Sequence, residues 1–103
     1  MRLFSNERYI SQGVKRQVPL PLSATLWFIL DKVKNSSEEL EYVQMFKLSA
    51  CHEDGKTFQI IEHIHEGDVD SSLIRIESEE TFTGTILIVD DGVATVMCFP
   101  SER

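Results

Sequence analysis

The sequence has no long hydrophobic run. Its longest uninterrupted apolar stretch spans residues 26–30, whereas a helix that crosses a bilayer needs about 20 such residues. Residues 1–8 also lack the apolar core of a secretory signal peptide. These two absences predict a cytoplasmic protein that does not engage a membrane.

Cysteine is scarce, with two residues, Cys51 and Cys98, too far apart to form a Cys-x-x-Cys motif. This excludes the cysteine-rich zinc and dithiol redox motifs that can be read from spacing. Each cysteine lies within an apolar strand pattern. Since reducing compartments rarely hold structural disulfides, we expect two free thiols.

The residue patterns that accompany catalysis are also missing. There is no glycine-rich phosphate loop and no Gly-x-Ser-x-Gly elbow. Cys51 and His52 are adjacent on a predicted strand, so their side chains point to opposite faces and cannot form a thiolate–imidazole pair. Turn formation accounts for Asp90, Asp91 and Gly92. The sequence therefore predicts a non-enzymatic protein without a cofactor.

What is present is the composition of an ordinary globular protein. The chain has 103 residues, of which 42% are hydrophobic and 26% are charged. This length supports one hydrophobic core but not two. We therefore expect residues 1–103 to form a single domain.

The first third of the chain predicts a strand followed by a helix. Residues 8–18 favour a strand with Ile10, Val14 and Val18 on one face, interrupted at Gly13 by a bulge or a close backbone approach. Prolines near its end lead into a helix over residues 22–35. The apolar residues of that helix follow spacings of three and four: Leu22, Leu26, Ile29, Leu30 and Val33.

The rest of the chain predicts β-structure. Residues 43–52 and 57–65 flank an Asp54-Gly55 turn, a strong hairpin signal. A two-residue turn there places Lys47 opposite Glu62 and Phe46 opposite His63. It also makes Glu53 and Lys56 cross-strand partners.

Further strands are predicted over residues 73–77, 83–89 and 93–99, the last two forming a hairpin around Asp91-Gly92. Both faces of this hairpin are apolar, which indicates a sheet centre or an interface. The predicted fold class is α+β, with a mainly antiparallel sheet in β-α-β-meander order and one amphipathic helix packed on one face.

His63 and His65 are the best candidates for a metal site. Side chains two positions apart on a strand share a face, so two imidazoles could meet one ion. A third ligand is missing, because His52 lies about 20 Å away along the strands. We therefore favour two partly exposed polar residues, and keep a small metal-dependent enzyme as an alternative.

Charge is divided unevenly along the chain. Residues 1–35 carry six basic and two acidic groups, a net charge of +4, whereas residues 36–103 have a net charge of −11. Arg8, Lys15 and Arg16, with Tyr9 as a stacking ring, are a candidate nucleic-acid surface. The net charge of the chain, −7, opposes phosphate binding, so nucleic acid is disfavoured as a partner.

The acidic second part of the chain instead predicts docking onto a basic protein surface. The candidate interaction residues are Glu66, Asp68, Asp70, Glu77, Glu79 and Glu80. A homodimer through an exposed sheet edge is a second possible association, because unpaired backbone groups can template another strand. The leading hypothesis is a non-enzymatic protein-binding or regulatory module.

Three short segments together resemble a known family. They are Asn-Glu-Arg-Tyr-Ile-Ser-Gln-Gly-Val at residues 6–14, Tyr-Val-Gln-Met-Phe-Lys-Leu at 42–48 and Val-Asp-Asp-Gly at 89–92. The chain is similar over nearly its whole length to domain of unknown function 960, a family of low-GC Gram-positive bacteria. The resemblance implies an intracellular α+β protein without an established activity, and it assigns no catalytic or binding residues.

Overall fold

The computed structural model describes residues 3–36, 41–64 and 72–103, which form six strands and two α-helices, with one short 3-10 helix. The elements are β1 (Glu7–Ile10), α1 (Gln12–Gln17), α2 (Leu20–Ser36), β2 (Val43–Glu53), β3 (Lys56–Ile64), β4 (Ser72–Glu77), β5 (Gly84–Asp90), β6 (Ala94–Cys98) and η1 (Pro100–Glu102).

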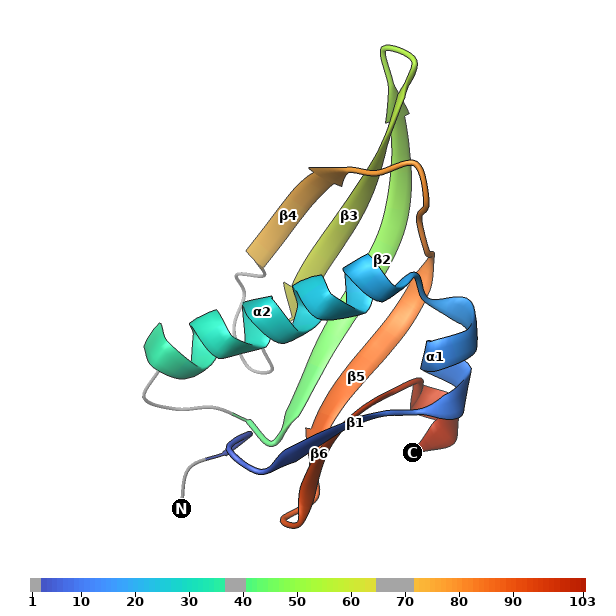
Figure 1. Cartoon of the computed structure of the whole chain (residues 1–103). Coiled ribbons are helices and arrows are strands. Elements are labelled where there is room, and N and C mark those ends of the chain that lie inside the picture. The colour runs from blue at the N-terminus through green and yellow to red at the C-terminus, as the bar shows by residue number, and fades with distance from the viewer. Residues whose placement is uncertain (1–2, 37–40, 65–71) are drawn as a thin grey trace.

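The strands form one sheet in the order β1-β6-β5-β2-β3-β4, and α2 lies across one of its faces (Figure 1). β1 pairs with β6 in parallel, whereas the other neighbours are antiparallel. The class is therefore α+β with a mixed sheet. The expectation of a β-α-β-meander is wrong in its last part, because β5 does not pair with β4.

The buried side chain of Gln59 binds the segment that connects β4 to β5. β5 pairs with β2 on the side opposite to β3. After β4, the chain therefore passes the ends of β3 and β2 before it enters β5. The side-chain amide of Gln59 donates to the carbonyl of Phe82 at 3.0 Å, and its Oε1 accepts from the Phe82 amide at 2.8 Å. This pair of hydrogen bonds replaces strand pairing for the crossing segment.

The β2–β3 hairpin has the predicted register. Asp54 and Gly55 have φ angles of 54° and 77°, which fits the left-handed turn that Asp-Gly favours. Phe46 lies opposite His63, and Lys47 opposite Glu62. The predicted Glu53–Lys56 neighbours are also opposite, but the ion pair of Glu53 is with Arg75 on β4.

The prediction of one strand over residues 8–18 is wrong. The strand ends at Ile10, and Ser11 caps a short helix by accepting a hydrogen bond from the Val14 amide at 3.2 Å. Ser is a preferred N-cap residue because its side chain satisfies a free helical amide. Val14 and Val18 still reach the core, but they do so from α1 and its end.

The predicted helix is confirmed and is slightly longer, as α2. Pro19 and Pro21 lie at its start, where a missing amide proton costs nothing. Its apolar stripe packs on the sheet face formed by alternate strand residues. The core residues of the two layers are Leu22, Leu26, Ile29 and Leu30 from α2 and Phe46, Leu48, Ile61, Ile86, Ile88 and Met97 from the strands.

Candidate functional site

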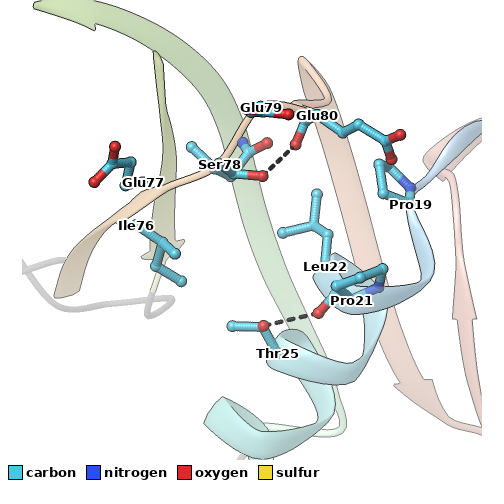
Figure 2. A pocket seen from close by; sticks show the side chains of 10 residues that line it. Pro19, Pro21, Leu22, Thr25, Ile76, Glu77, Ser78, Glu79 and Glu80 are labelled. Atoms are coloured by element: carbon cyan, nitrogen blue, oxygen red, sulfur yellow. Dashed lines mark hydrogen bonds between the residues drawn. The ribbon is translucent and has the colours of Figure 1, made fainter. Parts of the chain in front are cut away.

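A cleft of about 450 Å³ opens between the start of α2 and the segment that follows β4 (Figure 2). Leu22 and Ile76 provide apolar surface inside it, and carboxylates lie at its border. The full lining is Pro19, Pro21, Leu22, Thr25, Gln59, Ile76, Glu77, Ser78, Glu79 and Glu80. The cleft thus joins the helical layer to one end of the sheet.

Hydrogen bonds fix both walls of the cleft. On the helix side, Thr25 donates from Oγ1 to the Pro21 carbonyl at 2.8 Å. On the sheet side, the Ser78 amide donates to the Thr57 carbonyl at 3.0 Å, and Ser78 Oγ donates to the Glu80 carbonyl at 2.7 Å. The carboxylates therefore project from a backbone that is held in place.

Three of the six predicted interaction residues line this cleft, and all three are exposed. Glu79 and Glu80 lie at its mouth, and Figure 2 shows Glu80 extending toward Pro19. Glu77 ends β4 and points away from Leu22 in the same view. The other predicted residues, Glu66, Asp68 and Asp70, lie outside the described part of the chain.

The carboxylates of Glu79 and Glu80 are exposed at the border of the cleft, near the start of α2. Pro19 and Pro21 have no backbone N–H group. These two residues therefore cannot donate a hydrogen bond to the carboxylate of Glu79 or Glu80. The two carboxylates remain available to a ligand that brings its own donors.

His63 is buried, so the expectation of a partly exposed polar residue is wrong at this position. Its side chain is 1% exposed, its Nε2 lies 2.7 Å from Gln44 Oε1, and its ring stacks on Phe46 with centroids 4.5 Å apart. His65 lies outside the described residues. Within residues 3–36, 41–64 and 72–103, no three His, Cys, Asp or Glu side chains are grouped as metal ligands.

The predicted basic surface is divided between two elements. Arg8 on β1 forms an ion pair with Asp31 of α2 and lies 5.0 Å from the centre of the Trp27 ring. The hydrogen bond from Arg8 is the main reason that the pKa of Asp31 is lowered. Lys15 and Arg16 are exposed in the last turn of α1, so they lie on a helix and not on the strand predicted over residues 8–18.

Asp90 has a role that turn chemistry alone did not predict. Its carboxylate accepts hydrogen bonds from the Phe4 amide at 2.8 Å, the Gly92 amide at 2.9 Å and Asn6 Nδ2 at 3.0 Å. The Phe4 bond is the main cause that lowers the pKa of Asp90. Asp90 thus ties the N-terminal segment to the β5–β6 turn, a long-range contact that leaves no local sequence signal.

Glu102 is a second structural carboxylate that sequence patterns missed. It accepts hydrogen bonds from Ser11 Oγ at 2.7 Å, the Phe99 amide at 2.9 Å and the Gly13 amide at 3.1 Å. The Phe99 bond is the first cause that lowers the pKa of Glu102. A Cβ atom on Gly13 would lie 2.7 Å from Glu102 Oε2. Gly13 is therefore a point of close approach, as expected, although it lies in a helix.

The fold and the cleft together define a small α+β protein with an acidic, partly apolar cleft at one end of a mixed sheet. The described part of the chain contains no helix with the length and hydropathy that a bilayer crossing requires.

The chain belongs to the family described as Staphylococcal protein of unknown function (DUF960), whose model matches residues 7–102. This confirms the resemblance predicted from three short segments. No match was found among curated proteins. The crystal structure of a protein of unknown function from Enterococcus faecalis is similar, with a TM-score of 0.76 and 23% identity. The similarity covers 100% of this chain and 96% of that one, and it shows a shared fold.

Proposed function

We propose that this chain is a non-enzymatic, cytoplasmic protein-binding module that docks a basic segment of a partner protein at the cleft. The observation that carries the proposal is the placement of Glu79 and Glu80 at the mouth of a cleft with apolar walls. Exposed carboxylates attract a cationic segment, and the apolar surface of Leu22 and Ile76 suits the aliphatic stem of a Lys or Arg side chain.

Charge distribution supports a basic protein rather than a nucleic acid as the partner. The chain has a net charge of −7, which repels a phosphate backbone. Arg8, one of the three basic candidates, is already paired with Asp31. A partner with exposed lysines or arginines would be attracted both by the whole molecule and by the cleft.

The test is affinity capture from a nuclease-treated staphylococcal lysate at low and moderate salt. Three baits are compared: the wild type, Glu80→Lys at the cleft and Glu41→Lys. The two variants change the net charge equally, and Glu41 is an exposed residue before β2, at the end of that strand opposite to the cleft. They therefore separate the effect of the cleft from that of total charge.

We expect a protein that is retained by the wild type and by Glu41→Lys, lost from Glu80→Lys and released as salt rises. Equal retention by all three baits would contradict docking at the cleft. An empty eluate from the wild type at low salt would contradict a stable protein partner.

A further inference from the structure

The helices cover one face of the sheet, and the second face is rich in apolar residues. α2 and α1 pack against the face that bears Phe46, Ile86 and Met97. Strand alternation places the neighbouring residues on the opposite face, which we call the open face. Its apolar strand residues are Tyr9, Val43, Met45, Phe58, Ile60, Ile64, Leu73, Leu87, Val89 and Val96.

An antiparallel sheet that faces water on one side alternates apolar and polar residues. β5 does not follow this rule, because Ile86, Leu87, Ile88 and Val89 form an unbroken apolar run. Such runs are typical of strands that are covered on both faces. In the described part of the chain, both α-helices lie on the other face, and the short η1 contacts β5. Leu87 is only 4% exposed in the single chain, whereas its open-face neighbours Met45 and Val89 are half-buried. A second covering layer would therefore bury these neighbours.

The open face has hollows as well as protruding side chains. One hollow of about 380 Å³ is bordered by apolar residues and by two charged residues of opposite sign: Tyr42, Val43, Met45, Ile64, Glu41 and Arg103. A second, of about 300 Å³, is bordered by Ile60 and by mainly polar residues, among them Lys47 and Glu62. At the two edges of the sheet, Tyr9 and Leu73 protrude, with exposed fractions of 52% and 64%. The open face thus has both depressions and protruding side chains that a partner could contact.

The near balance of charge on the open face favours a second copy as its occupant. Its strands contribute three basic and four acidic residues, which nearly balance although the chain as a whole has a net charge of −7. They are Lys47, Lys56, Arg75, Glu7, Glu53, Glu62 and Glu77. A second copy can meet a nearly neutral face without like-charge repulsion, whereas a basic partner is drawn to the acidic cleft.

The area of the face indicates how strong such an association is. With strands about 4.8 Å apart and a rise of about 3.3 Å per residue, five residues of six strands cover roughly 480 Å² of flat sheet. Stable protein interfaces bury about 800 Å² per partner. Side-chain relief adds to the flat area, so the face suits a small interface that dissociates on dilution.

We propose that the open face mediates a two-fold symmetric homodimer, in which the sheets of two copies pack face to face. A two-fold axis brings the same patch of both copies together, so that every contact between two different residues occurs twice. A patch that combines apolar side chains with charges of both signs, such as the neighbours Lys47 and Glu62, is therefore able to complement itself. The dimer is a different association from the docking of a basic partner at the cleft, and it can be tested without that partner.

The test is sedimentation equilibrium of the purified protein over a range of concentrations. The wild type is compared with Met45→Lys at the hollow and Leu73→Lys at the edge of the open face. Phe28→Lys is the matched control, because Phe28 is 59% exposed on α2, away from the open face. Circular dichroism verifies that each variant is folded, and Leu73 tolerates a charge because it is already exposed.

We expect the wild type and Phe28→Lys to approach twice 11.8 kDa at about 100 μM, the range of a small, dissociable interface. Folded Leu73→Lys and Met45→Lys should remain at 11.8 kDa. A wild type that is monomeric at this concentration would overturn the proposal. So would a dimer that persists in both open-face variants, since this would indicate pairing through the edge of β1 or β4.

Discussion

At the scale of single residues, the most consequential side chain is a carboxylate with three donors around it. Asp90 is 8% exposed and accepts hydrogen bonds from Phe4 and Asn6, which are more than 80 residues away in the sequence, and from the nearby Gly92. Removal of a buried acceptor leaves its donors without a partner, and that penalty exceeds the value of the hydrogen bonds themselves.

Asp90→Ala should therefore lower the free energy of unfolding by about 1–3 kcal/mol. The measurement is urea denaturation followed by circular dichroism. Glu41→Ala, which removes an exposed carboxylate, is the control and should stay within about 0.5 kcal/mol of the wild type. Equal losses in the two variants would show that the Asp90 contacts do not stabilise the fold.

Asp90 also predicts a direction for the pH dependence of stability. Hydrogen bonds, that from Phe4 first, lower its pKa from the usual 3.8. The ionised form is thus favoured in the folded state, and its contribution is complete above pH 3.8 and lost as the pH falls through the lower folded pKa. Unfolding free energy should fall below that pH, and less steeply in Asp90→Asn. Parallel pH curves for the two proteins would contradict this assignment.

The two thiols should differ in reactivity. Cys98 is 5% exposed, and burial is the main cause that raises its pKa, whereas Cys51 is half-buried. A thiolate is the reacting form, so a raised pKa and low exposure both slow the reaction. An aromatic disulfide reagent should modify one thiol rapidly and one slowly, and Cys51→Ser should remove the fast phase. Loss of the slow phase instead would reverse the assignment.

At the scale of elements, the carboxylate of Glu102 fastens η1 to the start of α1. It occupies the space beside Gly13 that a methyl group would need. Alanine is a better helix former than glycine by about 1 kcal/mol, so the two effects of a Gly13→Ala change oppose each other. Their balance depends on Glu102.

A double-mutant cycle tests this contact. In the wild type, Gly13→Ala should displace the Glu102 carboxylate and lower stability or leave it unchanged. In Glu102→Ala, the same Gly13→Ala change should raise the free energy of unfolding by about 0.5–1 kcal/mol, because only the helix propensity remains. Thermal or urea unfolding of the four proteins gives the coupling, and additive effects would rule out the contact.

Elements set by local chemistry were predictable from the sequence. The β2–β3 register follows from the positive φ of Gly55 and the alternation of its strands, and α2 follows from one apolar stripe. α1 carried a usable signal, the Ser11 cap. The alternation of Ile10, Val14 and Val18 concealed it, because spacings of four suit a helix and a strand alike.

Long-range arrangement was not predictable in the same way. β5 pairs with β2, and β1 pairs with β6. The periodicity of a strand's own residues does not indicate which distant strand it pairs with. The cleft depends on this arrangement, since it brings Leu22 and Glu80 together. The acidic character of the candidate surface was predictable, whereas the apolar wall beside it required the fold.

At the scale of the whole molecule, the two candidate surfaces differ in chemistry. The cleft presents carboxylates at the end of the sheet, near the start of α2. The open face is apolar and nearly neutral, and it lies on the other side from α2 (Figure 1). The two proposed surfaces share only Glu77, so a dimer formed through the open face would leave Glu79 and Glu80 at the cleft for a basic partner.

The central claim is that the open face is covered by protein in solution, and methyl NMR of the wild type over a dilution series tests it most directly. We expect the methyl signals of Met45, Ile60 and Val96 to shift together with concentration, while those of Leu26 and Ile29 in the core stay fixed. Signals that do not move with concentration, or that move only for residues at the edges of β1 and β4, would contradict the account.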